Sequence, residues 1–152
     1  MDFHPSRLRR GEVLAGVGAV LLLVFMLAVK WYGHGDHSLT GWQALTNLRW
    51  LVIVTIACAL ALTITQATRR SPAVPATLSV IVTVLGLITV LALIYRVLID
   101  PLADEQVGAY LGLLSALVLA YGAYASLRQE GIATRDAPAD IPVIRPGGDS
   151  RS

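Results

Sequence analysis

The chain has 152 residues, of which 55% are hydrophobic and only 14% are charged, and its mean hydropathy is +0.66. Four stretches, residues 13–29, 50–67, 71–95 and 107–127, contain no charged residue. A water-soluble helix needs a polar face, so this composition excludes a soluble globular domain. The formal net charge of +2 is too small for a nucleic-acid binder, and we expect no nucleic-acid partner.

Each uncharged stretch is long enough, with its flanks, to cross a lipid bilayer. The apolar core of a bilayer is about 30 Å thick and needs about 20 helical residues. The sequence therefore predicts an all-α, membrane-embedded bundle of four transmembrane helices at about residues 12–30, 49–67, 74–98 and 106–127. Residues 1–11 form a short segment before the bundle. Residues 128–152 form a polar tail, which we expect to be disordered because it has too little apolar surface to fold alone.

The first span follows several arginines, as a secretory signal would. The apolar region of a signal is only about 7–15 residues long and ends at a cleavage site of small residues. Here the run continues to Val29 and Lys30 without such a site. We therefore expect this span to stay uncleaved.

The basic residues are shared unequally between the two ends of the four spans. Nine Lys and Arg residues lie on the side of the two termini, whereas Lys30, Arg49 and Arg96 alone lie on the other side. Because cytoplasmic segments carry the excess of Lys and Arg, both termini are expected in the cytoplasm.

Aromatic residues cluster at the predicted outer ends of the spans, where amphipathic rings prefer the headgroup layer. The expected interface anchors are Trp31, Trp42, Trp50 and Tyr95. In the first outer loop, apolar residues three apart between residues 38 and 48 predict helical structure. This segment is either a separate helix on the membrane surface or the first turns of the second span, and the second interpretation is favoured.

The fourth span carries a stripe of small residues. Its members, spaced four apart, are Gly108, Gly112, Ala116 and Ala120. Helices in lipid associate by close backbone approach, which small side chains permit. We expect this face to pack against the first or third span, or against the fourth span of a second copy.

The loop sequence His34-Gly35-Asp36-His37 is the one metal-like cluster, with two imidazoles and a carboxylate from His34, Asp36 and His37. No fixed spacing identifies such a site, so these residues are weak candidates and we expect no metal ion. Cys58 is the only cysteine and lies in mid-span, where it is expected to be a packing residue.

Glu12 invites comparison with small exporters that use a membrane carboxylate to exchange protons for cations. Such chemistry needs a carboxylate deep in the membrane. Glu12 precedes the apolar run and follows Arg10, so the sequence predicts a solvated charge at the water interface.

Arg96 lies at the outer end of the third span, four residues before Asp100, so the two side chains are expected to share one helical face. They are candidates for binding an anionic headgroup or an acidic ligand. The alternative, which we favour, is that Arg96 only extends its cationic end to the interface.

Several short motifs have a familiar layout. They are Trp31-Tyr32, Gly41-Trp42-Gln43-Ala44-Leu45, Gln66-Ala67-Thr68-Arg69-Arg70-Ser71-Pro72-Ala73, Tyr95-Arg96 and Gly108-Ala109-Tyr110-Leu111-Gly112-Leu113. Over about residues 10–130 the chain resembles small four-span integral membrane proteins of actinobacteria, a group without an established activity. The resemblance implies a bacterial plasma-membrane location and supplies no catalytic residue.

The spans contain no central charge, no nucleophile–base pair and no phosphate-binding loop, so we expect neither an enzyme nor a cofactor. The first functional hypothesis is a structural or accessory membrane protein that acts by helix or loop contacts with a membrane partner or a second copy. The alternative is a small transporter or lipid-binding protein that uses Arg96 and Asp100. A cavity lined by Thr55, Thr83 and Arg96 would favour the alternative, and a closed bundle would favour the first.

Overall fold

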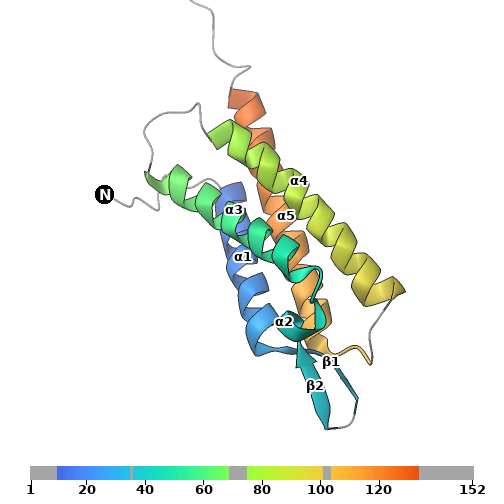
Figure 1. Cartoon of the computed structure of the whole chain (residues 1–152). Helices are drawn as coiled ribbons and strands as arrows, with labels where there is room; N and C mark the ends of the chain where they lie inside the picture. The colour runs from blue at the N-terminus through green and yellow to red at the C-terminus, as the bar shows by residue number, and fades with distance from the viewer. Residues whose placement is uncertain (1–9, 35, 69–74, 101–103, 134–152) are drawn as a thin grey trace, which may run out of the picture.

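The computed structural model describes residues 10–34, 36–68, 75–100 and 104–133 of the chain. Four long helices form a bundle (Figure 1), and each is long and apolar enough to cross a membrane. They are α1 (Arg10–Ala28), α3 (Arg49–Thr68), α4 (Pro75–Ile94) and α5 (Val107–Ala133). The prediction of four long apolar helices in a bundle is therefore confirmed.

The helix ends lie close to the predicted ones, with one clear difference. α5 runs through Ala133, six residues beyond the predicted end at Leu127. The residues after Leu127 begin with Arg128 and Gln129, which favour helix even without apolar neighbours. The predicted N-terminal segment, for residues 1–9, and the expected disorder of residues 134–152 lie outside the described residues.

The helices are arranged in a ring in which each packs against the next, in the order α1, α3, α4 and α5, and α5 packs back on α1. The α1–α5 contact is the most extensive of these. The buried core runs along the middle of the ring. Large buried side chains there include Leu22, Met26, Val52, Leu62, Leu93 and Leu119.

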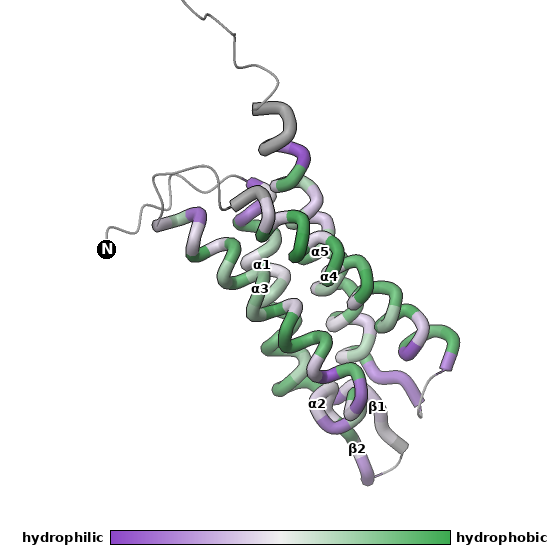
Figure 2. The backbone as a smooth tube through the Cα atoms, turned by 45° about the horizontal axis from the view of Figure 1, so that its top comes forward, coloured by the Kyte–Doolittle hydropathy of each residue, from purple (hydrophilic) through white to green (hydrophobic). Residues whose placement is uncertain are grey.

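Apolar residues also cover the outward faces of the helices (Figure 2). Val17 of α1, Val54 of α3, Val84 of α4 and Leu114 of α5 are all about half exposed. In water this surface would be unfavourable, whereas hydrocarbon solvates it well. The outward faces therefore fit a lipid environment.

One end of the bundle carries a small antiparallel sheet, which corrects the all-α expectation. Strands β1 (Lys30–His34) and β2 (His37–Thr40) pair so that His34 lies opposite His37. Residues 104–106 flank the other edge of β1. The amide of Gly33 donates to the carbonyl of Asp104 at 3.1 Å, and that of Gln106 donates to the carbonyl of Trp31 at 2.9 Å. We call this end, residues 29–34, 36–50, 95–100 and 104–106, the hairpin end.

The segment of residues 38–48 is not an extension of the second span, so that prediction is wrong. It contains the end of β2, the single-turn helix α2 (Gly41–Ala44) and a turn that leads into α3. The turn begins where Leu45 leaves the helical conformation, with φ −94° and ψ 45°. Leu45 is almost fully buried, so packing of this side chain into the core favours the break over a continuous helix.

Candidate functional site

The end of α4 is a π-helical turn, η2 (Tyr95–Ile99), which places Arg96 at the hairpin end. The amide of Asp100 donates to the carbonyl of Tyr95 at 2.9 Å, a bond that spans five residues. The hydroxyl of Tyr32 in β1 donates to the carbonyl of Arg96 at 3.1 Å. Single π-turns in α-helices occur frequently at functional sites. Here the turn is tied to the sheet through Tyr32.

Arg96 and Asp100 form the expected ion pair. Nη1 of Arg96 lies 2.8 Å from Oδ2 of Asp100 and also donates to the carbonyl of Asp100 at 3.3 Å. The Arg96 side chain is 22% exposed and that of Asp100 is 59% exposed. An ion pair this accessible is weak, so it positions the guanidinium rather than holding the fold together.

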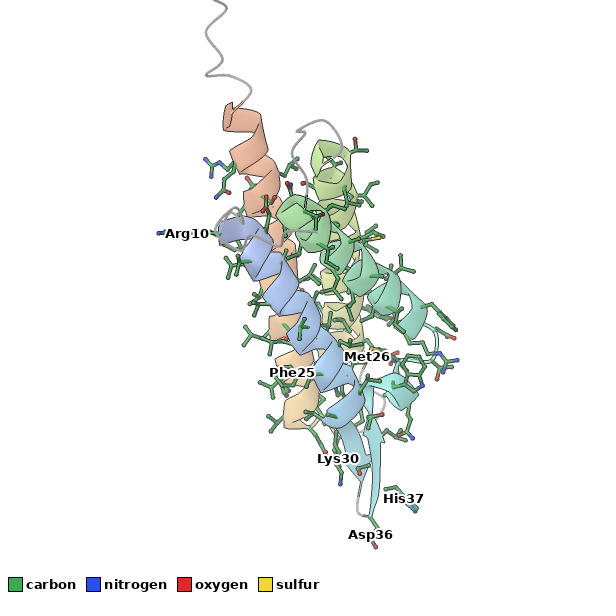
Figure 3. The ribbon with its side chains drawn as sticks, turned by 90° about the vertical axis from the view of Figure 1, so that its left-hand side faces the viewer. Arg10, Phe25, Met26, Lys30, Asp36 and His37 are labelled. Carbon is green, nitrogen blue, oxygen red and sulfur yellow. The ribbon has the colours of Figure 1, made fainter. Side chains whose placement is uncertain are left out.

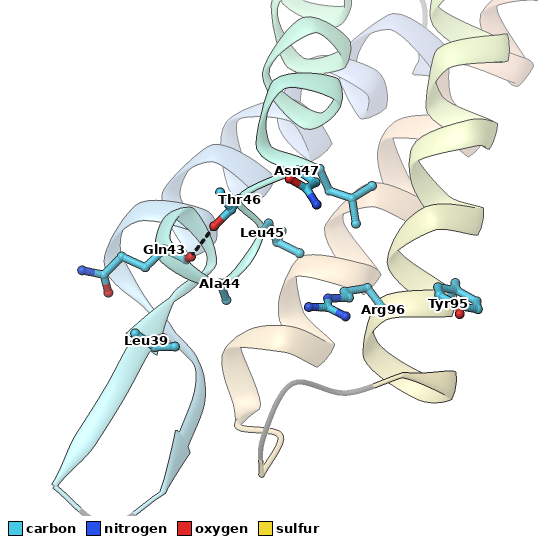
Figure 4. A pocket seen from close by; sticks show the side chains of 9 residues that line it. Leu39, Gln43, Ala44, Leu45, Thr46, Asn47, Tyr95 and Arg96 are labelled. Carbon is cyan, nitrogen blue, oxygen red and sulfur yellow. Dashed lines mark hydrogen bonds between the residues drawn. The ribbon is translucent and has the colours of Figure 1, made fainter.

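A groove of about 410 Å³ lies between η2 and the segment that joins β2 to α3. We call it the hairpin groove. Its lining includes Leu39, Gln43, Leu45, Asn47, Leu48 and Arg96. In Figure 4 the Arg96 side chain extends from η2 toward Leu45 and Asn47. The groove therefore combines leucine side chains with two amides and one cation.

Tyr32 is fully buried beneath this site. Burial raises its pKa above the ordinary value of 10.0, and the carboxylates of Glu105 and Asp100 act in the same direction. Arg96 lowers the pKa but does not offset the burial. Tyr32 thus keeps its proton and donates its hydrogen bond at physiological pH.

Three of the four predicted interface anchors lie at the surface of the hairpin end. Trp50 is 60% exposed and Tyr95 is 54% exposed. Trp42 is partly buried, and its ring centroid lies 5.3 Å from the guanidinium carbon of Arg49, which also lies 5.6 Å from the Trp50 ring. These cation–π contacts fix Arg49 at the first turn of α3.

Trp31 is not a surface anchor, which corrects the fourth of these predictions. It has no exposed area, and its Nε1 donates to the carbonyl of Phe25 at 2.8 Å. A Cβ atom added at Gly41 or Gly112 would collide with its ring. The indole is buried because Gly41 of α2 and Gly112 of α5, which have no side chains, leave space for the ring.

The small-residue stripe of α5 does not form a single contact. Gly108 and Gly112 lie against Lys30 and Trp31, whereas Ala120 lies near Gly86 of α4, where an added Cβ atom would be 3.2 Å from the Ala120 Cα. Ala116, between them, is fully buried. Steps of four residues rotate by about 40° on a helix with 3.6 residues per turn. The stripe therefore turns from the hairpin toward α4.

The closest helix contact uses glycines that the sequence prediction did not single out. An added Cβ atom at Gly11 would lie 2.5 Å from the amide nitrogen of Ser126, and one at Gly18 would lie 2.5 Å from that of Leu119. One at Gly122 would collide with the backbone of Ala15. Gly11 and Gly18 are seven residues apart and so share one face of α1, which could have signalled this contact.

The weak metal candidates lie at the tip of the hairpin. Asp36 and His37 are exposed there (Figure 3), and the side chain of His34 lies outside the described residues. Within residues 10–34, 36–68, 75–100 and 104–133, no group of three or more metal-binding side chains comes together.

Glu12 is buried, with 3% of its surface exposed, so the prediction of a solvated charge is wrong. α5 continues beyond the start of α1, and the close approach at Gly11 brings its backbone against this first turn. The hydroxyl of Thr63 in α3 also donates to the carbonyl of Glu12 at 3.4 Å. Protein atoms therefore surround the Glu12 side chain in place of water.

Cys58 is partly buried against the core, as a packing residue would be.

The threonines that would mark a cavity do not meet Arg96. Thr55 and Thr89 join α3 to α4 through a buried hydroxyl–hydroxyl hydrogen bond of 2.7 Å. Thr83 donates to the carbonyl of Ser79 on its own helix at 2.7 Å. α3 and α4 are thus in direct contact at Thr55, and Thr83 lines a separate groove of about 310 Å³ between α4 and α5.

Comparison with known proteins finds no matching family model, no similar curated protein and no similar solved structure.

Proposed function

We propose that the chain is a non-enzymatic, multi-pass protein of the bacterial plasma membrane, with both termini in the cytoplasm. In this proposal its hairpin end faces outward and acts by contacts with a membrane partner. The nine-to-three distribution of Lys and Arg supports the orientation. The apolar outward faces of the helices support the membrane location.

The observation that carries this proposal is the contrast between helices that pack directly on one another and an elaborated hairpin end. Buried Thr55 and Thr89 join the neighbouring helices α3 and α4, whereas β2 carries the exposed side chains of His37 and Leu39. β1 lies between β2 and residues 104–106, so β2 is the outer strand of this cap. An outer strand presents backbone groups to which a partner can bind.

The test is photocrosslinking in native membranes from a reactive side chain at Leu39, with a matched position at Val84 on the outward face of α4. Both side chains are about half exposed. We expect Leu39 to give one discrete crosslinked protein that decreases when unmodified protein is co-expressed, and Val84 to give none. Equal crosslinking at both positions, or none that can be competed, contradicts the proposal.

The hairpin groove favours a second function, lipid binding at Arg96 and Asp100. It favours lipid binding over transport because its lining residues all lie at one end of the bundle, while the buried Thr55–Thr89 pair holds α3 and α4 in direct contact further along. Leucines and a guanidinium in one groove match the two parts of a lipid, an acyl chain and a charged headgroup.

A further inference from the structure

The hairpin groove opens at the depth of a lipid headgroup, given the membrane orientation proposed above. Trp50, in the first turn of α3, and Tyr95, the first residue of η2, flank this region and are both more than half exposed. Exposed aromatic residues at the ends of membrane helices lie at the headgroup layer. A lipid of the surrounding bilayer can therefore enter this groove directly from the membrane.

The size and lining of the groove suit an amphiphile. Its volume of about 410 Å³ lies within the range of small-molecule sites. Leu39 and Leu48, which are both at least partly accessible, provide apolar surface for the upper part of an acyl chain. Gln43 and Asn47 provide amides that can donate hydrogen bonds to ester or phosphate oxygens.

Arg96 supplies a cation whose shape matches a phosphate. In the described part of the chain, Nη1 of Arg96 is the donor in both hydrogen bonds between its guanidinium and Asp100. A guanidinium carries five N–H donors in a planar fork, and this geometry suits two oxygens of one phosphate. The π-turn and the Tyr32 hydrogen bond hold the backbone that carries this fork.

Asp100 is a competitor for the same donors. Its carboxylate occupies Nη1 at 2.8 Å, yet 59% of its side chain is exposed, so water can solvate it when it is displaced. An exposed carboxylate bound to a partly buried arginine is weakly held. A phosphate that also anchors an acyl chain in the groove can replace it.

From these contacts we propose that the hairpin groove binds an anionic phospholipid of the outer leaflet. Its phosphate binds Arg96 in place of Asp100, and its acyl chain lies along Leu39 and Leu48. This inference rests on the lipid-binding function proposed above and adds the class of lipid and the competing carboxylate.

The test measures lipid retention by the full chain purified in detergent and offered equal amounts of phosphatidylglycerol and phosphatidylcholine. Native mass spectrometry counts the bound lipid. We expect a preference for phosphatidylglycerol that Arg96→Gln reduces about tenfold, because charge-assisted hydrogen bonds are lost. Lys30→Gln removes one positive charge from the same end but outside the groove lining, and it should leave the preference unchanged.

Asp100→Asn separates ligand binding from a structural ion pair. If the carboxylate competes with the phosphate, this variant raises the preference for phosphatidylglycerol by about two- to fivefold, the strength of an exposed ion pair. If the pair only holds the fold, Asp100→Asn lowers lipid retention as Arg96→Gln does, and the inference is overturned. This readout remains decisive even if Arg96→Gln does not fold.

Two other results also overturn the inference. Equal retention of both lipids by the wild type excludes an anionic site. Competition by soluble glycerol phosphate at the same concentration as the lipid shows that the acyl chain makes no contribution. Because both lipids are supplied in detergent, the result is independent of membrane orientation, and failure of the proposed protein contact leaves it unaffected.

Discussion

Trp31 joins the hairpin end to the bundle. Its indole ring is buried against Gly41 of α2 and Gly112 of α5, and its nitrogen donates to the end of α1. One side chain thus contacts three helices. A buried tryptophan removes a large apolar area from solvent and usually satisfies its N–H, as it does here.

The slot around Trp31 gives the first prediction. Gly112→Leu inserts a branched side chain where the Trp31 ring lies, so the free energy of unfolding should fall by about 1–3 kcal/mol through overpacking. The matched control is Leu114→Ala, on the outward face of the same helix, where 58% of the side chain is exposed. Thermal unfolding in detergent measures both variants. Equal melting of Gly112→Leu and the wild type would show that the slot is not tight.

Tyr32 gives the second prediction, a pH dependence. Tyr32→Phe removes the hydrogen bond to the Arg96 carbonyl and should cost about 1 kcal/mol of stability near neutral pH. Burial raises the pKa of Tyr32 in the folded state above 10.0, the value expected in the unfolded chain. The folded protein therefore holds the phenolic proton more tightly, and this stabilisation is complete below pH 10 and is lost as the pH rises through the folded pKa.

The wild type should accordingly lose its stability advantage over Tyr32→Phe above pH 10. Chemical unfolding of both proteins between neutral and strongly alkaline pH measures this difference, and the other tyrosines cancel between them. A difference that stays constant up to strongly alkaline pH would be inconsistent with the hydrogen-bonded, buried phenol.

At the residue scale, local sequence predicts only what depends on near neighbours. The Arg96–Asp100 pair could be predicted because four residues bring both side chains to one helical face. The burial of Trp31 could not, since it depends on glycines contributed by α2 and α5. Glu12 shows the same limitation, because α5, distant in sequence, passes over the first turn of α1.

At the scale of elements, α3 and α4 are linked by the hydroxyls of Thr55 and Thr89. We predict that valine substitutions at the two positions are coupled by about 0.6 kcal/mol, and by up to about 1.7 kcal/mol, the range for such bonds between membrane helices. A double-mutant cycle of unfolding free energies in detergent measures the coupling.

The control for this cycle is the pair Thr65 and Thr83, whose hydroxyls donate to carbonyls of their own helices. Valine substitutions there should be additive. Coupling at Thr55 and Thr89 no larger than in the control pair would show that the hydroxyls do not join the two helices.

The β-hairpin is the element that the sequence analysis did not predict. In the sequence, Gly35 and Asp36 separate the residues of the two strands, and two strand patterns separated by such a pair are a sequence signal for a β-hairpin. The same residues could also be interpreted as a metal-binding loop, and the apolar spacing of residues 38–48 suggested a helix. Pairing of β1 with residues 104–106 completes the sheet, and no local pattern predicts it.

At the scale of the whole molecule, the four long helices could be predicted because bilayer thickness dictates the length and composition of each span. Their order in the ring could not, since every helix has an apolar outward face and an apolar inward face. Small residues decide which faces meet. Gly11, Gly18 and Gly122 bring α1 and α5 together, and the turning stripe of α5 then reaches α4.

The central claim is that the chain crosses the bacterial plasma membrane with the hairpin end outside. His37, at the exposed tip of the hairpin, and Arg128, at the opposite end of the bundle, are both exposed. In a Cys58→Ala background, the most direct test is labelling of His37→Cys and Arg128→Cys in intact cells with a maleimide that cannot cross membranes. We predict that His37→Cys is labelled in intact cells and Arg128→Cys only after permeabilisation. Labelling of Arg128→Cys, but not His37→Cys, in intact cells would contradict the claim.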